Sequence, residues 1–174
     1  MRRLLFVVTC LLMGLAVAAA PVAAAPDTGL SRSVTGPFSG TSVFDFSTPA
    51  CSFAHQVYDA SYNAQAGSSG SFHLDGCVTF GAGGAFDYTG TFQLQLNRAT
   101  LTGTVSGVVG NTPAHGCQDG LFPGSLTFTL TVQSGTARFK AAIGAISLDG
   151  TWCSPTTPNV AGPIDGNLTG HLTR

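Results

Sequence analysis

Apolar and polar residues alternate with a period of two from about residue 38 to the end of the chain. Phe72, Leu74, Val78 and Phe80 share one face of such a segment, and polar residues occupy most of the other positions. This alternation is typical of a β-strand with one buried face. The pattern predicts about eight strands and no amphipathic helix. The inner faces carry Phe44, Phe46, Phe86, Tyr88, Phe92, Leu94, Leu96, Leu101, Val105, Val109, Leu126, Phe128, Leu130, Val132, Ile146, Leu148, Trp152, Ile164, Leu168 and Leu172.

Most breaks between these segments are short and rich in turn residues, as at 47–49, 66–70 and 81–84. Short connections favour antiparallel pairing of consecutive strands. We therefore predict an all-β fold, an eight-stranded antiparallel up-and-down barrel, which leaves no strand edge exposed. A two-sheet β-sandwich is the alternative. It would need long crossing connections, which residues 110–123 and 154–163 alone could supply.

Glycines are frequent on the faces that are otherwise apolar, at Gly90, Gly103, Gly107, Gly150, Gly166 and Gly170. One interpretation is structural, because glycine permits the tight coiling that a small barrel needs. The other is functional, because glycine leaves room inside the barrel for an apolar ligand. The sequence leaves both open.

The first 24 residues have the pattern of a secretory signal peptide, with Arg2 and Arg3 before an apolar run and small residues at 22–24. We expect cleavage after Ala24, a loose N-terminal arm at 25–37 and one barrel domain at 38–174. The predicted location is secreted, or extracellular. No later segment is expected to span a membrane.

Four cysteines remain after the predicted cleavage: Cys51, Cys77, Cys117 and Cys153. An even number in an exported chain predicts two disulfides. Each of the pairs Cys51–Cys77 and Cys117–Cys153 brackets a predicted turn, so we expect these two bonds. Cys117 is expected on the 110–123 loop, which the bond would pin over the end of the strand that carries Cys153.

The chain contains eight Asp, no Glu and one Lys. Such a low charge predicts no basic patch, so nucleic acid is not an expected partner. His55 and His73 would face each other if Cys51 and Cys77 were opposed in paired strands, which makes them the candidate metal ligands. Their face of the sheet is polar, however, and the preferred interpretation is a solvated outer surface. We expect neither a metal nor another cofactor.

The segment Val132–Trp152, VQSGTARFKAAIGAISLDGTW, resembles a part of the allene oxide cyclase/dirigent barrel family. Those proteins have a glycine-rich turn with a basic residue and a phenylalanine between two strands. Matching positions here are Gly135, Thr136, Arg138, Phe139, Ala142 and Gly144, whereas Ser134, Ala137 and Ala141 replace expected glycines. The resemblance implies an eight-stranded barrel with a central cavity. It also implies an assembly that is often oligomeric, so a homo-oligomer is a candidate state.

The resemblance does not transfer catalysis. The cavity glutamate of the cyclases has no counterpart in a chain without Glu, and the dirigent aspartates and arginine match no residue here. Binding of a small apolar ligand in the barrel interior is therefore the first functional hypothesis, and an enzyme is the less favoured one. A cyclase or isomerase and a structural or interaction protein of the cell envelope are the alternatives. The candidate cavity residues are Phe44, Tyr58, Tyr62, Tyr88, Phe92, Phe128 and Trp152.

Overall fold

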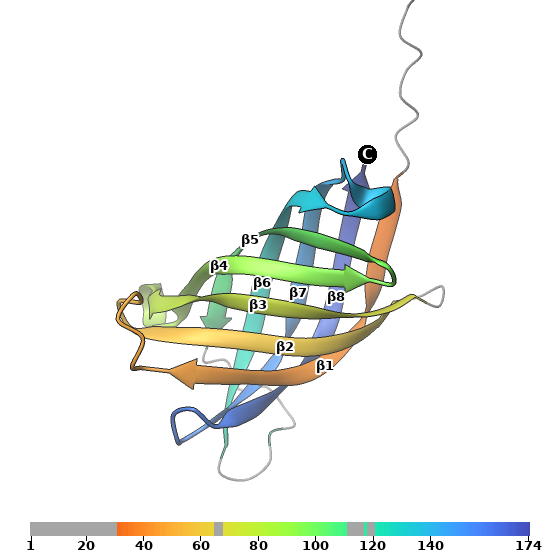
Figure 1. Ribbon diagram of the computed structural model, residues 1–174. Coiled ribbons are helices and arrows are strands. Elements are labelled where there is room, and N and C mark those ends of the chain that lie inside the picture. Colours follow the sequence, from red (N-terminus) through yellow and green to blue (C-terminus); the bar gives the residue numbers. More distant parts are fainter. Residues whose placement is uncertain (1–30, 65–67, 111–116, 118–120) are drawn as a thin grey trace, which may run out of the picture.

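Eight antiparallel strands close into a barrel in the order of the chain (Figure 1). The computed structural model describes residues 31–64, 68–110, 117 and 121–174, so the predicted signal peptide lies outside the described residues. Two single 3₁₀ turns, η1 (Ala82–Gly84) and η2 (Ala137–Phe139), accompany the strands. The strands are β1 (Arg32–Asp45), β2 (Ala54–Ala64), β3 (Ser68–Phe80), β4 (Phe86–Leu96), β5 (Ala99–Gly110), β6 (Leu121–Gly135), β7 (Ile143–Pro155) and β8 (Ala161–Thr173).

Closure of the barrel comes from the pairing of the first strand with the last. β1 pairs with β8 from Arg32 to Val43, and it pairs with β2 on its other side from Phe38 to Asp45. The sheet therefore has no free edge, as in other closed barrels. The predicted up-and-down barrel is confirmed, and the chain does not form the sandwich.

The predicted loose arm at 25–37 is wrong for its last six residues, which belong to β1. Val34 is buried, and the segment pairs with β8. Pro37 lies opposite Asn167 of β8, one residue before pairing with β2 begins at Phe38. Proline has no backbone N–H to donate, and it is tolerated there because β1 pairs with β8 alone at that position.

Glycine pairs on neighbouring strands let the barrel coil tightly. Gly76 lies opposite Gly90, and Gly150 lies opposite Gly166. A Cβ atom on Gly90 would lie 2.2 Å from the carbonyl oxygen of Asp75 and 2.6 Å from the Cα of Gly76. No side chain fits at such distances, which supports the structural interpretation of the inward glycines.

Aromatic rings occupy the space that the glycines leave inside the barrel. The rings of Tyr58, Tyr88 and Phe128 pack against one another with centroids 4.9–5.3 Å apart, and all three side chains are buried. Near Gly166, the Cζ atom of Phe38 lies 2.8 Å from where a Cβ would stand. The described centre of the barrel is thus a packed aromatic core.

All three tyrosines of the sequence lie in this core. None of them should therefore titrate near pH 10, the ordinary pKa of a tyrosine hydroxyl being about 10. Burial raises the pKa of Tyr62 to about 12, and it also raises the pKa values of Tyr58 and Tyr88. Because these pKa values are raised, the neutral tyrosines contribute to the free energy of unfolding. This contribution is fully present below the unfolded-state pKa of about 10 and is lost as the pH rises beyond it. Ultraviolet absorbance should show no tyrosinate near pH 10 in the folded protein. A tyrosine that titrates there without unfolding would contradict the buried placement.

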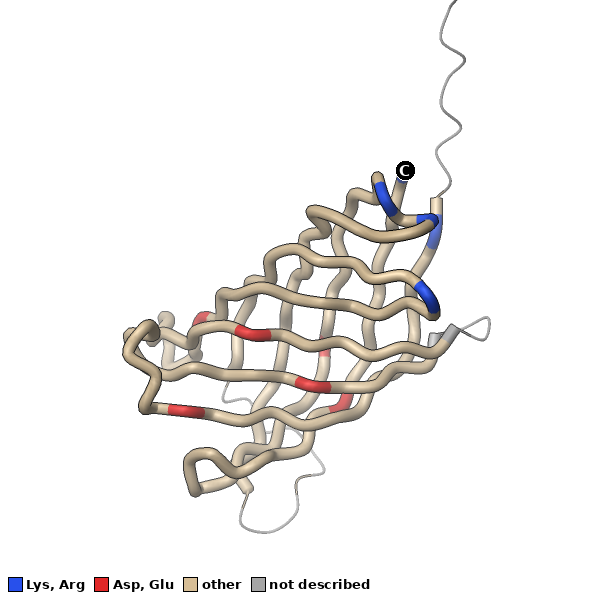
Figure 2. The backbone as a smooth tube through the Cα atoms, in the orientation of Figure 1, with Lys and Arg blue, Asp and Glu red and all other residues tan. Residues whose placement is uncertain are grey.

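Alternate connections meet at opposite ends of the barrel, and the two ends differ in chemistry. One end carries the β1–β2, β3–β4, β5–β6 and β7–β8 connections. We call it the aromatic end, because its rings are Phe44, Phe46, Phe53, Phe80, Phe86, Phe122 and Trp152. The opposite end carries all the lysine and arginine residues of the described part of the chain (Figure 2). We call it the basic end, formed by Arg32, Arg98, Arg138, Lys140 and Arg174.

Candidate functional site

A continuous chain of aromatic rings runs across the aromatic end. Trp152 of β7 packs on Phe44 of β1 with centroids 5.2 Å apart, and Phe44 stacks on Phe46 at 6.0 Å. Phe53 extends the chain from Phe46 to Phe80 and Phe86 through centroid distances of 4.3–5.4 Å. Contacts of this kind hold the rings in fixed mutual positions.

The rings surround an open pocket of about 200 Å³. Two of its ring residues remain exposed to solvent, Phe46 at 52% and Phe122 at 65%. Large apolar side chains that stay exposed side by side are typical of a binding surface. The pocket is lined by Phe44, Phe46, Phe53, Phe86, Phe122, Trp152, Ser154, Pro155, Thr156, Thr157, Pro158 and Val160.

Local hydrogen bonds hold the loops that carry these residues. The backbone N–H of Asn159 donates to the carbonyl oxygen of Phe44 at 2.8 Å and ties the β7–β8 loop to the end of β1. Asp45 accepts bonds from the hydroxyl and the amide of Ser47 and from the hydroxyl of Thr48. These bonds hold the pKa of the Asp45 carboxyl below its ordinary value. The turn after Phe46 is therefore fixed, and so is the position of that ring.

Both disulfides lie at the aromatic end, and they join the predicted partners. Cys51–Cys77 has a Cα separation of 5.3 Å, and Cys117–Cys153 has one of 5.6 Å. Cys117 lies outside the strands, as expected, and bonds to the neighbour of Trp152 in β7. Most of the 110–123 loop lies outside the described residues. The two bonds fasten both the β1–β2 and the β5–β6 connections beside the pocket.

The pocket lining offers hydroxyl groups and apolar surface but no acid or base among the described residues. Ser154, Thr156 and Thr157 supply its hydroxyls. The indole Nε1 of Trp152 is buried and has no hydrogen-bond partner within the described chain. Such a lining can enclose an uncharged molecule, and it provides no side chain suited to proton transfer.

The seven predicted cavity residues fall into two groups. Phe44 and Trp152 line the pocket. The others, Tyr58, Tyr62, Tyr88, Phe92 and Phe128, are buried in the barrel core. Sequence reasoning missed Phe53, Phe122 and Val160 as lining residues. The sequence feature that could have identified them is that each is a large apolar residue in or beside a predicted turn, where polar residues are usual.

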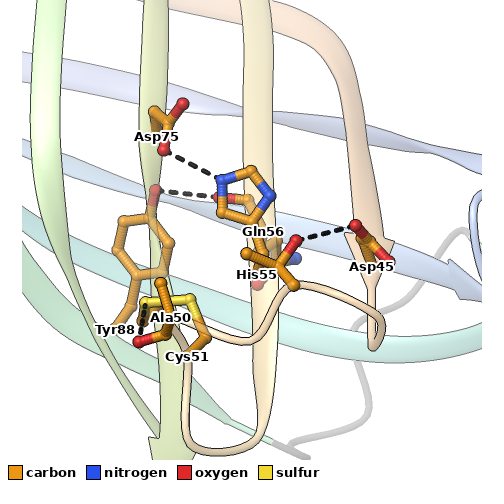
Figure 3. A network of polar contacts seen from close by, with 9 residues as sticks. Asp45, Ala50, Cys51, His55, Gln56, Asp75 and Tyr88 are labelled. Carbon is orange, nitrogen blue, oxygen red and sulfur yellow. Dashed lines mark hydrogen bonds and ion pairs between the residues drawn. A yellow bond between two sulfur atoms is a disulfide. The ribbon is translucent and has the colours of Figure 1, made fainter.

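A few polar groups lie deep in the barrel, between the pocket and the aromatic core. Gln56 is fully buried, stands opposite Phe44 in the β1–β2 register, and leaves both side-chain amide atoms without a partner in the described chain. The hydroxyl of Tyr88 donates to the backbone oxygen of Gln56 at 3.2 Å (Figure 3). The Tyr58 hydroxyl has no such partner among the described residues. Unpaired groups of this kind are costly to bury, so the core beneath the pocket is not optimised for stability alone.

The predicted opposition of His55 and His73 is wrong. His55 lies opposite Cys77, and His73 lies opposite Asp59. Cys51 precedes β2 in a loop, so its bond to Cys77 does not set the strand register. Each histidine instead pairs with a carboxylate on the outer wall, His55 with Asp75 at 2.9 Å (Figure 3) and His73 with Asp59 at 2.7 Å. No group of three metal-ligating side chains occurs within the described part of the chain.

Comparison with known proteins gives no further guide to this site. No family model, curated protein or solved structure matches the chain. Among the described residues, no helix has the length and apolar character needed to cross a membrane.

Proposed function

We propose that the protein is exported and binds a small, uncharged, apolar molecule at the aromatic end of the barrel. The observation that carries the proposal is the aromatic pocket, in which two of the lining phenylalanines, Phe46 and Phe122, remain exposed to solvent. Two disulfides beside the pocket are typical of proteins that leave the reducing cytoplasm. They also hold the pocket in shape before a ligand arrives, which lowers the entropy lost on binding.

The size of the pocket indicates the size of the ligand. Its volume of about 200 Å³ lies below the range of roughly 300–1,000 Å³ that is usual for drug-sized ligands. An apolar cavity of roughly 150 Å³ is enough to hold benzene. The pocket therefore suits a molecule of one or two rings, or the end of an alkyl chain. The ligand is thus expected at the mouth of the barrel and not at its centre, because the tyrosines and Phe128 fill the centre.

Binding is favoured over catalysis because the lining contributes shape and apolar surface. A cyclase or isomerase needs an acid, a base or a cation at the reacting atoms. The described lining residues present none of these groups. A role in the cell envelope is compatible with the Ser- and Thr-rich wall, but no feature of that wall selects a partner.

Replacing Phe122 by serine should weaken ligand binding and leave the fold intact. Phe122 is 65% exposed, so the folded protein loses little packing, whereas a bound ligand loses a ring contact. We expect the Kd for 1-aminonaphthalene, a neutral two-ring dye, to rise roughly fivefold, as for about 1 kcal/mol of lost apolar contact. Fluorescence titration of the dye measures the change.

Ile143→Ser is the matched control. Ile143 is 63% exposed and starts β7 at the basic end of the barrel, away from the pocket. Its replacement removes a similar amount of exposed apolar surface and should leave the Kd unchanged. Equal losses in the two variants would mean that the dye adheres to apolar surface in general, and the proposed site would then be wrong.

A further inference from the structure

Basic residues are few in the sequence, and most of them lie at the basic end of the barrel. Five of the seven basic residues of the chain lie there, whereas the six aspartates of the described residues lie along the wall and toward the other end (Figure 2). The cause is topological, because the β4–β5 turn, the β6–β7 turn, the start of β1 and the end of β8 all meet at this end. The expectation of no basic patch, drawn from composition, is therefore wrong.

Arg138 lies at the centre of this cluster. It lines three hollows, together with Arg32 and Arg174 in the first, with Arg32 in the second and with Arg98 in the third. The first two hollows share Arg32, Arg138 and Phe139, and they measure about 50 and 40 Å³. Spaces of this size can take a single small group but not an extended chain.

The arginines around the hollows are free to bind an anion. Within the described residues, none of them forms an ion pair, and the guanidinium carbon of Arg138 lies over the ring of Phe139, 5.2 Å from its centroid. The floor beneath them is apolar, made of buried Phe139, Leu172, Val34 and Leu96. An apolar floor weakens solvent screening, so an anion held there would interact with the guanidinium groups more strongly than it would in open water.

We propose that the basic end holds a binding site for a phosphate or sulfate group, centred on Arg138 and Arg32. Guanidinium groups bind such oxyanions through paired, charge-assisted hydrogen bonds, which lysine cannot reproduce. The group belongs either to a free phosphate or to the head of an anionic lipid. This site is independent of the apolar pocket at the other end.

Calorimetric titration with inorganic phosphate at low salt, and flotation with lipid vesicles, test the site on the full folded chain. The vesicles contain phosphatidylcholine alone or an equimolar mixture with phosphatidylglycerol. Arg138→Gln and Arg32→Gln should each weaken the binding about tenfold, as expected for the loss of a charge-assisted bond. Lys140→Gln removes the same charge from the same end but from outside the hollows, and it should change the affinity less than about twofold. Both arginines are exposed, and unfolding midpoints check that the variants fold.

Arginine-dependent binding of inorganic phosphate supports a free anion as the ligand. Arginine-dependent flotation with the phosphatidylglycerol vesicles alone supports a lipid head group. Equal losses in the Lys140→Gln and Arg138→Gln proteins would show general attraction between charges and would overturn the site. Absence of binding to both probes would overturn it as well.

Discussion

Gly90→Ala is expected to lower the free energy of unfolding by about 3 kcal/mol, near the upper end of what overpacking usually costs. The added methyl would meet backbone atoms of β3 at 2.2–2.6 Å. These atoms belong to the strand ladder and cannot move aside without breaking its hydrogen bonds. Denaturant unfolding measures the loss, which should appear as a lower midpoint.

Gly81→Ala is the control for this substitution. A Cβ there would meet the carboxylate of Asp87, at 3.0–3.1 Å. That side chain is exposed and can rotate away, so we expect a change of less than about 1 kcal/mol. Equal effects of the two substitutions would show that the glycine pairs do not determine how closely the strands approach.

Removal of the Cys117–Cys153 bond should have the largest effect of any change at the aromatic end. The bond closes a loop of 37 residues, from a sequence separation of 36. Chain entropy then predicts a loss of about 4 kcal/mol on replacement of both cysteines by alanine, against about 3.5 kcal/mol for Cys51–Cys77. Denaturant unfolding of the two double variants measures this difference.

The same bond should also affect the pocket, because Cys153 follows Trp152 directly. We expect the Cys117→Ala, Cys153→Ala protein to bind 1-aminonaphthalene more weakly under conditions in which it stays folded. Mild reduction of the native protein should likewise loosen the β5–β6 connection before the barrel unfolds. An unchanged unfolding midpoint would contradict the chain-entropy argument, and an unchanged Kd would show that the bond does not support the pocket.

The strands were predictable because their residues are packed on one face and solvated on the other. Each segment from Phe72 to Leu172 satisfies that rule, and closure followed from the short connections. The cysteine pairs were also predictable, since both bracket a turn. The strand register was not, because Cys51 lies in a loop before β2, and a bond from a loop residue does not align two strands.

The functional ends were harder to predict because both depend on residues at the strand ends and in the connections between strands. Phe53 and Phe122 belong to connections or strand ends, where alternation carries no information about the direction of a side chain. Arg32, Arg98 and Arg138 are distant in sequence, and counting charges does not show that the turns place them together. Topology decides both clusters, since every second connection returns to the same end of an up-and-down barrel.

Trp152 offers the most direct test of ligand binding at the aromatic end, because the chain contains no other tryptophan. A proton–nitrogen correlation spectrum of the labelled protein should therefore show one indole peak. On titration with naphthalene, the ring current of a ligand in the pocket should shift that peak in a saturable manner, while the backbone peaks of Asn97 and Arg138 at the basic end stay in place. An indole peak that does not move at saturating naphthalene, or equal shifts at the two ends, would contradict the proposed site.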